Sequence, residues 1–270
     1  MPEAGFFSAL NRWGGFVKFS HTVFALPFAL ASMVLAAREN RGWPGWRAFL
    51  LILAAMVCAR TCAMAFNRIV DREFDRVNPR TAQRHLPAGI ISLAQAWGLC
   101  ISSGVGLVVA SYFINRPCFY LSPLALLVVC FYSLTKRFTD FTHLYLGVAL
   151  SLAPLGAWLA VRGTLGVLPM ILALAVVAWL IGFDVIYALQ DYDFDQRQGL
   201  HSLVVRWGVE NALKFAFLSH IAMWTLLGLL GLLSGFRVAY FIGLVIILAG
   251  SGIDLIICSL LNVTCPSPGN

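Results

Sequence analysis

The chain alternates between long apolar runs and short polar segments. A helix needs roughly 20 consecutive apolar residues to cross a bilayer, and the sequence contains eight runs of about that length. The pattern therefore predicts an all-α, polytopic membrane protein with one transmembrane domain over residues 1–263 and a disordered tail over residues 264–270. The eight predicted spans lie near residues 16–37, 46–66, 90–113, 117–134, 143–161, 167–187, 211–233 and 238–261.

Two polar islands interrupt this pattern, and each adjoins the end of a predicted span. The first, residues 67–89, reads NRIVDREFDRVNPRTAQRHLPAG, and the second, residues 184–208, reads DVIYALQDYDFDQRQGLHSLVVRWG. The first island holds three and the second holds four of the twelve acidic residues of the chain. Acids concentrated at two places predict one site assembled from both islands.

Composition agrees with a membrane protein. Hydrophobic residues make up 60% of the chain and charged residues 11%, whereas a soluble domain carries about a quarter charged residues. The net charge of +7 comes from short loops between spans, so it does not indicate a nucleic-acid surface. Twelve lysines and arginines fall on the side of the two islands and six on the other side. Because cytoplasmic loops carry the excess of Lys and Arg, both islands are predicted to face the cytoplasm.

One arginine, Arg60, lies inside the second predicted span. Arg60, Asn67 and Asp71 are separated by seven and four residues, so they share one helical face if the helix continues past Phe66. An intramembrane arginine usually faces a cavity, and this interpretation makes Arg60 a candidate substrate-binding residue. Under the opposing interpretation, Arg60 only extends to the membrane interface.

Each island carries two aspartates four residues apart, Asp71 with Asp75 and Asp191 with Asp195. On a helix such pairs project from one face, where like charges repel unless a cation lies between them. Carboxylates suit Mg²⁺, which typically connects one or two carboxylates to substrate phosphates. The spacing therefore predicts a magnesium site.

Basic residues close to these aspartates complete the candidate site. Metal ions and cationic side chains together clamp a diphosphate, and such a site promotes ionisation of the attached carbon if the diphosphate is a leaving group. The opposing interpretation is that both islands are solvated loops whose charges only fix the topology. The basic candidates are Arg80, Arg84 and Lys136.

Three motifs make residues 11 to about 250 resemble the UbiA superfamily of intramembrane prenyltransferases. The family motifs are Asn-x-x-x-Asp-x-x-x-Asp followed by Arg-Thr-x-x-Arg-x-Leu-Pro-x-Gly, then Tyr-x-x-x-Lys, then Asp-x-x-Tyr-x-x-Gln-Asp-x-x-x-Asp followed by Gly-x-x-Ser. The matching positions are Asn67, Asp71, Asp75, Arg80, Thr81, Arg84, Leu86, Pro87 and Gly89, then Tyr132 and Lys136, then Asp184, Tyr187, Gln190, Asp191, Asp195, Gly199 and Ser202.

The resemblance implies nine helices around a central cavity and Mg²⁺-dependent transfer of a polyprenyl group from its diphosphate to an aromatic ring. It implies that five residues bind the diphosphate through magnesium, namely Asn67, Asp71, Asp75, Asp191 and Asp195. It implies phosphate contacts from Arg80, Arg84 and Lys136 and a substrate-binding position at Tyr132. It also implies catalytic roles for the four aspartates and for Asp184 and Tyr187. An aromatic ring such as that of Tyr187 steadies an allylic cation.

The amino-acid sequences of the two islands resemble those of the bacterial group labelled 4-hydroxybenzoate polyprenyltransferase, which acts in ubiquinone synthesis. This implies a bacterial inner-membrane enzyme whose acceptor is an aromatic hydroxy acid, 4-hydroxybenzoate as the first choice. The acceptor 1,4-dihydroxy-6-naphthoate, of menaquinone synthesis, stays open because both are planar phenols with a carboxylate that Arg60 could pair with. Two further functions stay open at this point: a family member without activity, and a transporter or ion channel that uses intramembrane acids.

Two positions depart from the family pattern. Arg68 follows the motif asparagine where many members have aspartate, which removes one possible metal ligand. The family usually continues with another helix after a polar turn, whereas this chain passes from Leu248 into AGSGIDLIICSLLNVTCPSPGN. The expectation is that the last helix is lost or replaced.

Overall fold

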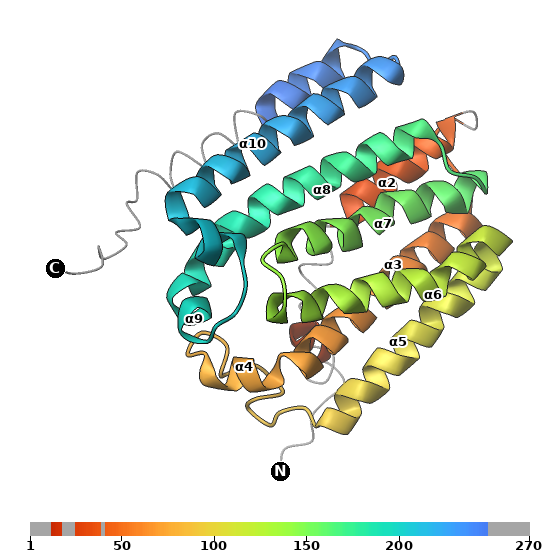
Figure 1. Cartoon of the computed structure of the whole chain (residues 1–270). Coiled ribbons are helices and arrows are strands. Elements are labelled where there is room, and N and C mark those ends of the chain that lie inside the picture. Colours follow the sequence, from red (N-terminus) through yellow and green to blue (C-terminus); the bar gives the residue numbers. More distant parts are fainter. Residues whose placement is uncertain (1–11, 18–24, 39–40, 248–270) are drawn as a thin grey trace.

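The computed structural model describes residues 12–17, 25–38 and 41–247, and the helices within these ranges form one bundle (Figure 1). The α-helices are α2 (Leu26–Ala36), α3 (Trp46–Val70), α4 (Arg72–Val77), α5 (Leu93–Ile114), α6 (Arg116–Phe131), α7 (Thr142–Arg162), α8 (Val167–Ala188), α9 (Tyr192–Arg197) and α10 (Leu203–Leu233). Two 3₁₀ helices, η3 (Tyr132–Arg137) and η4 (Leu189–Asp191), extend α6 and α8.

Membrane-length helices dominate the described part of the chain, which confirms the predicted all-α membrane architecture. Six helices there are long and apolar enough to cross a membrane: Trp46–Val70, Leu93–Ile114, Arg116–Arg137, Thr142–Arg162, Val167–Arg197 and Leu203–Leu233. Within the described residues, the first and eighth predicted spans contain the apolar helices Leu26–Ala36 and Val238–Ile247, and residues 18–24 and 248–261 of these spans lie outside the described part. The predicted tail at 264–270 and the expected change after Leu248 lie outside the described residues.

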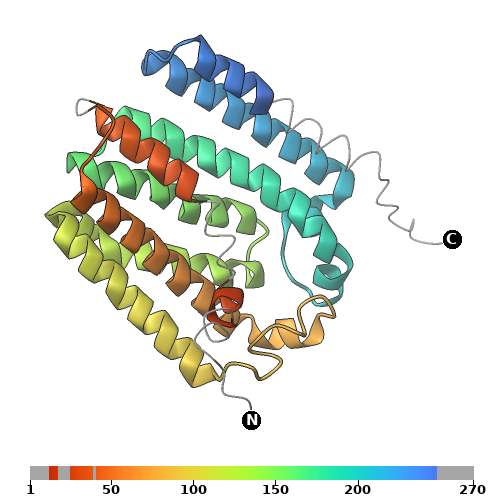
Figure 2. The same cartoon turned by 180° about the vertical axis from the view of Figure 1, so that it is seen from behind.

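The helices run side by side, and both polar islands lie at one end of the bundle (Figures 1 and 2). Helix α8 packs between α7 and α10, while α3 packs on α5. Helix α4 follows α3 directly, and α9 follows α8 through η4. The chain reversals at this end therefore bring α4 and α9 next to each other, which the two views show from opposite sides.

Helix α3 continues past Phe66 to Val70, as the proposed shared face of Arg60, Asn67 and Asp71 requires. Asp71 has φ −90° and ψ 3°, and α4 begins immediately after it. The backbone amide of Asp75 donates to the Asp71 carbonyl at 2.8 Å, so one near-helical turn connects the two aspartates. The first part of this island is thus a helical extension of a membrane span, and this extension ends at Asn78.

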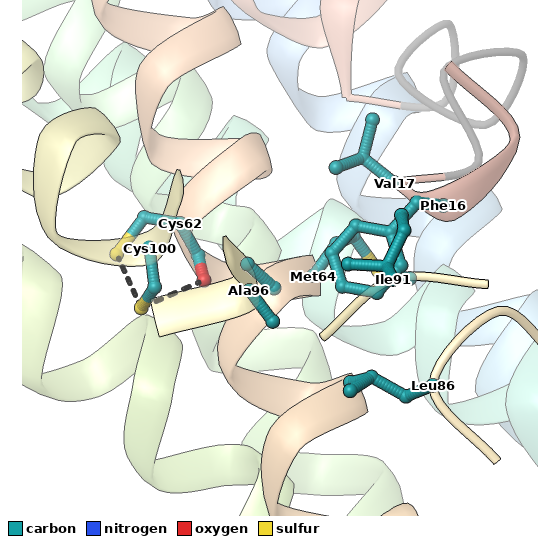
Figure 3. Close-up of a cluster of buried hydrophobic side chains, with 9 residues drawn as sticks. Phe16, Val17, Cys62, Met64, Leu86, Ile91, Ala96 and Cys100 are labelled. Carbon is teal, nitrogen blue, oxygen red and sulfur yellow. Dashed lines mark hydrogen bonds between the residues drawn. The ribbon is translucent and has the colours of Figure 1, made fainter. Parts of the chain in front are cut away.

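A cluster of buried side chains fixes the loop after α4 against α3 and α5 (Figure 3). Phe16, Met64 and Ile91 lie together in this cluster, and Leu86 joins it from the loop. The cluster anchors the loop that carries the basic residues of the first island. Its members are Phe16, Val17, Cys62, Met64, Ala65, Leu86, Ile91, Ala96 and Cys100.

Helices α7 and α8 approach each other closely at Gly147. A Cβ atom at this position would lie 3.1 Å from the carbonyl oxygen and 3.2 Å from the Cα of Val177. These contacts are tighter than ordinary van der Waals contacts, and the atoms met belong to backbone that cannot move aside. Glycine therefore allows the two helices to pack backbone to backbone.

Candidate active site

The first island presents a buried carboxylate, Asp75, that is 6% exposed. The Arg84 Nη1 donates to Asp75 Oδ1 at 2.6 Å, and Arg68 Nη1 lies 3.8 Å from Oδ2. Arg68 is itself 5% exposed. Asp75 Oδ2 accepts no hydrogen bond within the described ranges, although buried polar atoms are normally satisfied.

Asp71 lies at the junction of α3 and α4 and is more accessible. Asn67 Nδ2 donates to its Oδ2 at 3.0 Å, and Arg137 Nη2 lies 3.7 Å from its Oδ1. Burial raises the pKa of Asp71 to about 6; the positive charges of Lys136 and Arg137 oppose the rise, and the Asp75 carboxylate adds to it. An acid whose charge is disfavoured in this way is better matched to a cation than to water.

The two islands meet through Arg80 and Asp191, which are 111 residues apart in the chain. Arg80 donates to both carboxylate oxygens of Asp191, from Nε to Oδ1 at 2.8 Å and from Nη2 to Oδ2. Asn78 Nδ2 adds a bond to Oδ1 at 3.4 Å. Arg80 Nη1 also donates to the Tyr187 hydroxyl at 3.4 Å. The islands thus form one polar region, as their shared acidity predicts.

Lys136, on η3, lies between the islands. Its Nζ is 4.0 Å from Asp195 Oδ2, and its charge also acts on Asp71 and Asp191. Asp195 is 2% exposed, and its Oδ2 accepts no hydrogen bond from the described part of the chain. Lys136 is therefore a cation shared by carboxylates of both islands.

Arg60 lies on α3, seven residues before Asn67, and Tyr132 is the first residue of η3. Arg60 Nε is buried and has no hydrogen-bond partner among residues 12–17, 25–38 and 41–247. Arg60 interacts electrostatically with Tyr132, and Tyr132 in turn interacts with Asp71 and Asp184. The cavity interpretation of Arg60 stays a prediction.

Four residues of the site are not identified by the sequence patterns. Arg68 looks in the sequence like the loss of a metal ligand, but it pairs with Asp75. Asn78 and Arg137 sit beside predicted site residues but match no motif position. His143 carries no motif signal, and its Nδ1 lies 2.7 Å from Asp184 Oδ2.

A second group of polar contacts holds the Lys136 segment in place. Asp140 accepts from Arg206 Nη1 at 2.6 Å and lies 2.9 Å from His201 Nδ1. The backbone amide of His201 donates to the Lys136 carbonyl at 3.0 Å. Burial raises the pKa of Asp140, but the bonds from Arg206 and His201 outweigh it, so the pKa lies below its ordinary value. These contacts fasten the loop before α7 to the loop after α9.

We expect Asp140→Asn to raise the KM for the diphosphate-bearing substrate that this site predicts, while changing kcat less. The amide cannot accept charged hydrogen bonds as strongly, so the Lys136 carbonyl loses its fixed partner. Steady-state kinetics in membranes provides the measurement. Glu210→Gln, which removes an exposed carboxylate paired with Lys214, is the matched control, and equal kinetics in the two variants contradicts this role of Asp140.

The carboxylates fit a magnesium ion that is shared with a substrate better than a preformed metal cage. In the described part of the chain, no three His, Cys, Asp or Glu side chains lie close enough together to hold a metal ion. Magnesium keeps several waters and is usually bound through one or two carboxylates plus phosphates, so such a cage is not required. The Oδ2 atoms of Asp75 and Asp195, which accept no hydrogen bond from any described residue, are hard oxygen donors of the required kind.

The amino-acid sequence is similar to one protein family and to curated members of one enzyme group. The sequence model described as the UbiA prenyltransferase family matches residues 25–258. The 4-hydroxybenzoate octaprenyltransferase of Francisella tularensis subsp. novicida (strain U112) is 31% identical over 217 residues, which are 80% of this chain and 75% of that protein. The protein of the same name from Tolumonas auensis (strain DSM 9187 / NBRC 110442 / TA 4) is 32% identical over 207 residues, 77% of this chain and 72% of that protein.

Solved structures share the fold. The apo structure of a UbiA homolog from Aeropyrum pernix K1 matches with a TM-score of 0.82 and 30% identity, covering 91% of this chain and 90% of that one. A UbiA homolog from Archaeoglobus fulgidus bound to GPP and Mg²⁺ matches with a TM-score of 0.71 and 21% identity, covering 91% and 86%. At the latter identity the likeness concerns the fold alone.

Proposed function

The chain belongs to the UbiA prenyltransferase family, and from this premise we propose that it transfers a polyprenyl group from polyprenyl diphosphate to 4-hydroxybenzoate with the help of Mg²⁺. It is an integral membrane enzyme and an aromatic prenyltransferase of the 4-hydroxybenzoate polyprenyltransferase type. The identity of the acceptor, the use of Mg²⁺ and the roles of individual residues are our proposals.

The observation that carries the proposal is the union of both islands through Arg80, Asp191 and Lys136. In the free enzyme, the cations neutralise the carboxylates. A diphosphate offers these cations a partner of higher charge, and the carboxylates then become free to hold a metal. We therefore propose that the metal–diphosphate group binds at these ion pairs.

The cations of the site bind the leaving group. Arg80, Arg84 and Lys136 hold the phosphate oxygens as negative charge grows on them during departure. Asn67, Asp71, Asp75, Asp191 and Asp195 would hold magnesium, which would neutralise part of the same charge and make the diphosphate a better leaving group. This assignment is supported by two buried carboxylate oxygens that accept no hydrogen bond within the described residues, Asp75 Oδ2 and Asp195 Oδ2.

We propose that Tyr187 steadies the allylic carbon that the diphosphate leaves. Its hydroxyl accepts from Arg80, and its ring stacks on Phe183 with centroids 6.4 Å apart and planes inclined by 16°. A cation is attracted to the face of an aromatic ring. The ring therefore stabilises positive charge next to the phosphate-binding arginine.

Arg60 and Tyr132 suit the acceptor. The Arg60 guanidinium has a buried Nε without a hydrogen-bond partner among the described residues, and a carboxylate on a phenol is its natural partner. Both 4-hydroxybenzoate and 1,4-dihydroxy-6-naphthoate carry such a group. The names of the curated relatives favour 4-hydroxybenzoate, and the second acceptor is included in the test below.

We also propose that the site faces the cytoplasm at a bacterial inner membrane. Support comes from the twelve lysines and arginines on the side of the islands against six on the other side. The bacterial origin of the curated relatives agrees with it. A diphosphate substrate would then enter from the aqueous side, while its isoprenoid chain lies among apolar helices.

The test uses membranes that contain this chain, geranyl diphosphate and Mg²⁺. The two acceptors are offered side by side, and a parallel sample contains EDTA. The expected result is a prenylated 4-hydroxybenzoate that disappears with EDTA and returns when excess Mg²⁺ is added. Product from the naphthoate alone would transfer the proposal to that acceptor, and no product from either acceptor with inserted protein would refute it.

Lys136→Ala is expected to raise the KM for prenyl diphosphate about tenfold, because one charge-assisted phosphate contact is lost. The KM for the aromatic acceptor should change much less, since the proposed acceptor position is at Arg60 and Tyr132. Initial rates with each substrate varied in turn separate the two effects. Lys214→Ala, which removes an exposed lysine paired with Glu210, is the control, and an unchanged diphosphate KM in Lys136→Ala removes Lys136 from the site.

A further inference from the structure

A histidine and an aspartate form a pair on the inner side of the diphosphate region. His143 on α7 is 1% exposed, and its Nδ1 lies 2.7 Å from Oδ2 of Asp184 on α8. The Asp184 side chain is 24% exposed. A substrate in the site can therefore reach Asp184 but not His143.

The packing of α7 on α8 fixes this pair. Gly147, one turn beyond His143, brings the two helices to backbone contact at Val177. Side chains in such a close-packed contact have little freedom to change rotamer. The imidazole is thus held against the carboxylate by the fold, without help from a loop.

The surroundings of His143 bear on which of its ring nitrogens carries hydrogen. Its Nε2 is buried and has no hydrogen-bond partner in the part of the chain that the structure describes. An imidazolium would bury an unsatisfied N–H group there, which is costly. With hydrogen on Nδ1, the ring donates to Asp184 Oδ2, and Oδ1 is then the carboxylate oxygen that can take a proton.

Asp184 also has a defined position along its helix. Asp184, Tyr187 and Asp191 are separated by three and four residues, the spacing of one helical face. At about 1.5 Å per residue in α8 and about 2.0 Å per residue in η4, Asp184 lies about 12 Å from Asp191 along the axis, with Tyr187 between them. Arg80 contacts both Tyr187 and Asp191. Along this face, Asp191 lies at the proposed diphosphate site, the aromatic ring of Tyr187 follows, and the carboxylate of Asp184 comes last.

We propose that His143 is a positioning residue that orients Asp184 to accept the proton released by the aromatic substrate; this role depends on the proposed function. The C–O bond to the diphosphate breaks, and its electron pair leaves with the diphosphate. The ring carbon ortho to the hydroxyl forms a C–C bond to the allylic carbon. That ring carbon then loses its hydrogen as a proton to Asp184 Oδ1, which restores the aromatic ring, and the proton passes to water after product release.

The effects of two charged or titratable neighbours must be distinguished from the proposed role of His143. Tyr132 interacts electrostatically with Asp184, and Asp195 interacts with His143. Loss of His143 could therefore act through the metal-binding carboxylate instead of Asp184. Such an effect would raise the Mg²⁺ concentration needed for half-maximal rate or the KM for prenyl diphosphate, whereas the proposed role changes kcat.

The experiment measures the kinetic isotope effect with 4-hydroxybenzoate deuterated at both carbons ortho to the hydroxyl. In the wild-type enzyme, the effect should be near 1, because loss of the ring proton follows C–O cleavage. His143→Leu should lower kcat about 100-fold through misplacement of the acceptor group and should produce a primary isotope effect of about 2 or more as proton transfer becomes limiting. His143→Asn places an amide nitrogen where Nδ1 was and should restore both values.

Two further variants test whether the effect of His143→Leu comes from its contact with Asp184. His220→Asn removes another buried histidine, which packs against α8 at Gly182, and should lower thermal stability without an isotope effect. If His143→Leu does not insert, Asp184→Asn takes its place and should show the same isotope effect. A rate loss in His143→Leu or Asp184→Asn with an isotope effect still near 1 overturns the proposal. Absence of product from the wild-type enzyme would instead refute the proposed function.

Discussion

Asp71→Asn is expected to lower prenyl transfer about 100- to 1000-fold while the protein still folds and inserts. The asparagine keeps the size of the side chain and an oxygen that can accept from Asn67, which now donates to Asp71 Oδ2 at 3.0 Å. It removes only the negative charge. Transfer should fall because a metal ligand facing the diphosphate is lost.

The raised pKa of Asp71 predicts the effect on stability. Its pKa of about 6 in the folded protein, where burial disfavours the charge, exceeds the ordinary value of about 3.9. The ionised carboxylate therefore destabilises the fold above pH 6, and protonation relieves this as the pH falls toward 4. Asparagine carries no charge, so Asp71→Asn should melt at the same temperature as the wild type or slightly higher at pH 7.

Turnover in membranes and thermal melting of the solubilised protein together provide the measurement. Glu73→Gln is the control, because Glu73 lies in the same island, is exposed and pairs only with Arg72 among the described residues. It should behave as wild type in both assays. Near-normal turnover of Asp71→Asn would remove Asp71 from the metal site, and collapse of the fold would show that its charge is structural.

Helix positions were predictable because each long apolar run has one stable conformation in a bilayer, where every backbone group must be satisfied within the helix. The predicted spans near 90–113, 143–161 and 167–187 differ from α5, α7 and α8 by only a few residues at their ends. The predicted span near 211–233 is longer in the structure, because α10 begins at Leu203 and passes through a kink at Gly208. At Gly208, φ is 76°, a conformation that glycine adopts without strain.

The pairing of charges could not be predicted, because it depends on contacts between distant segments. The spacing of Asp71 and Asp75 places both on one side of the first island, but it does not indicate that Arg84 and Arg68 share Asp75. The contact of His143 with Asp184 depends on the close approach of α7 and α8. Arg68 resembles a missing ligand in the sequence, although its position makes it a partner for a neighbouring acid.

Asp75→Asn is expected to destabilise the protein by about 3–5 kcal/mol, in contrast to Asp71→Asn, because it leaves a buried cation without its partner. Arg68 is 5% exposed, and its Nη1 lies 3.8 Å from Asp75 Oδ2. Arg84 also loses a carboxylate at 2.6 Å, but it is more accessible and can turn to water. The measurement is the free energy of unfolding of the solubilised protein in denaturant, with prenyl transfer assayed in parallel.

The double variant Arg68→Met/Asp75→Asn separates the structural role of Asp75 from its proposed catalytic role. Methionine fills a similar volume without charge, so the double variant should regain most of the lost stability. Transfer should stay low, because the carboxylate that would bind the metal is still absent. Recovery of both stability and transfer would show that Asp75 serves only to neutralise Arg68, and a loss below about 1 kcal/mol in Asp75→Asn alone would place the pair among weak surface ion pairs. The expected outcome, stability restored without activity, makes Arg68 the structural partner of a residue that is needed for chemistry.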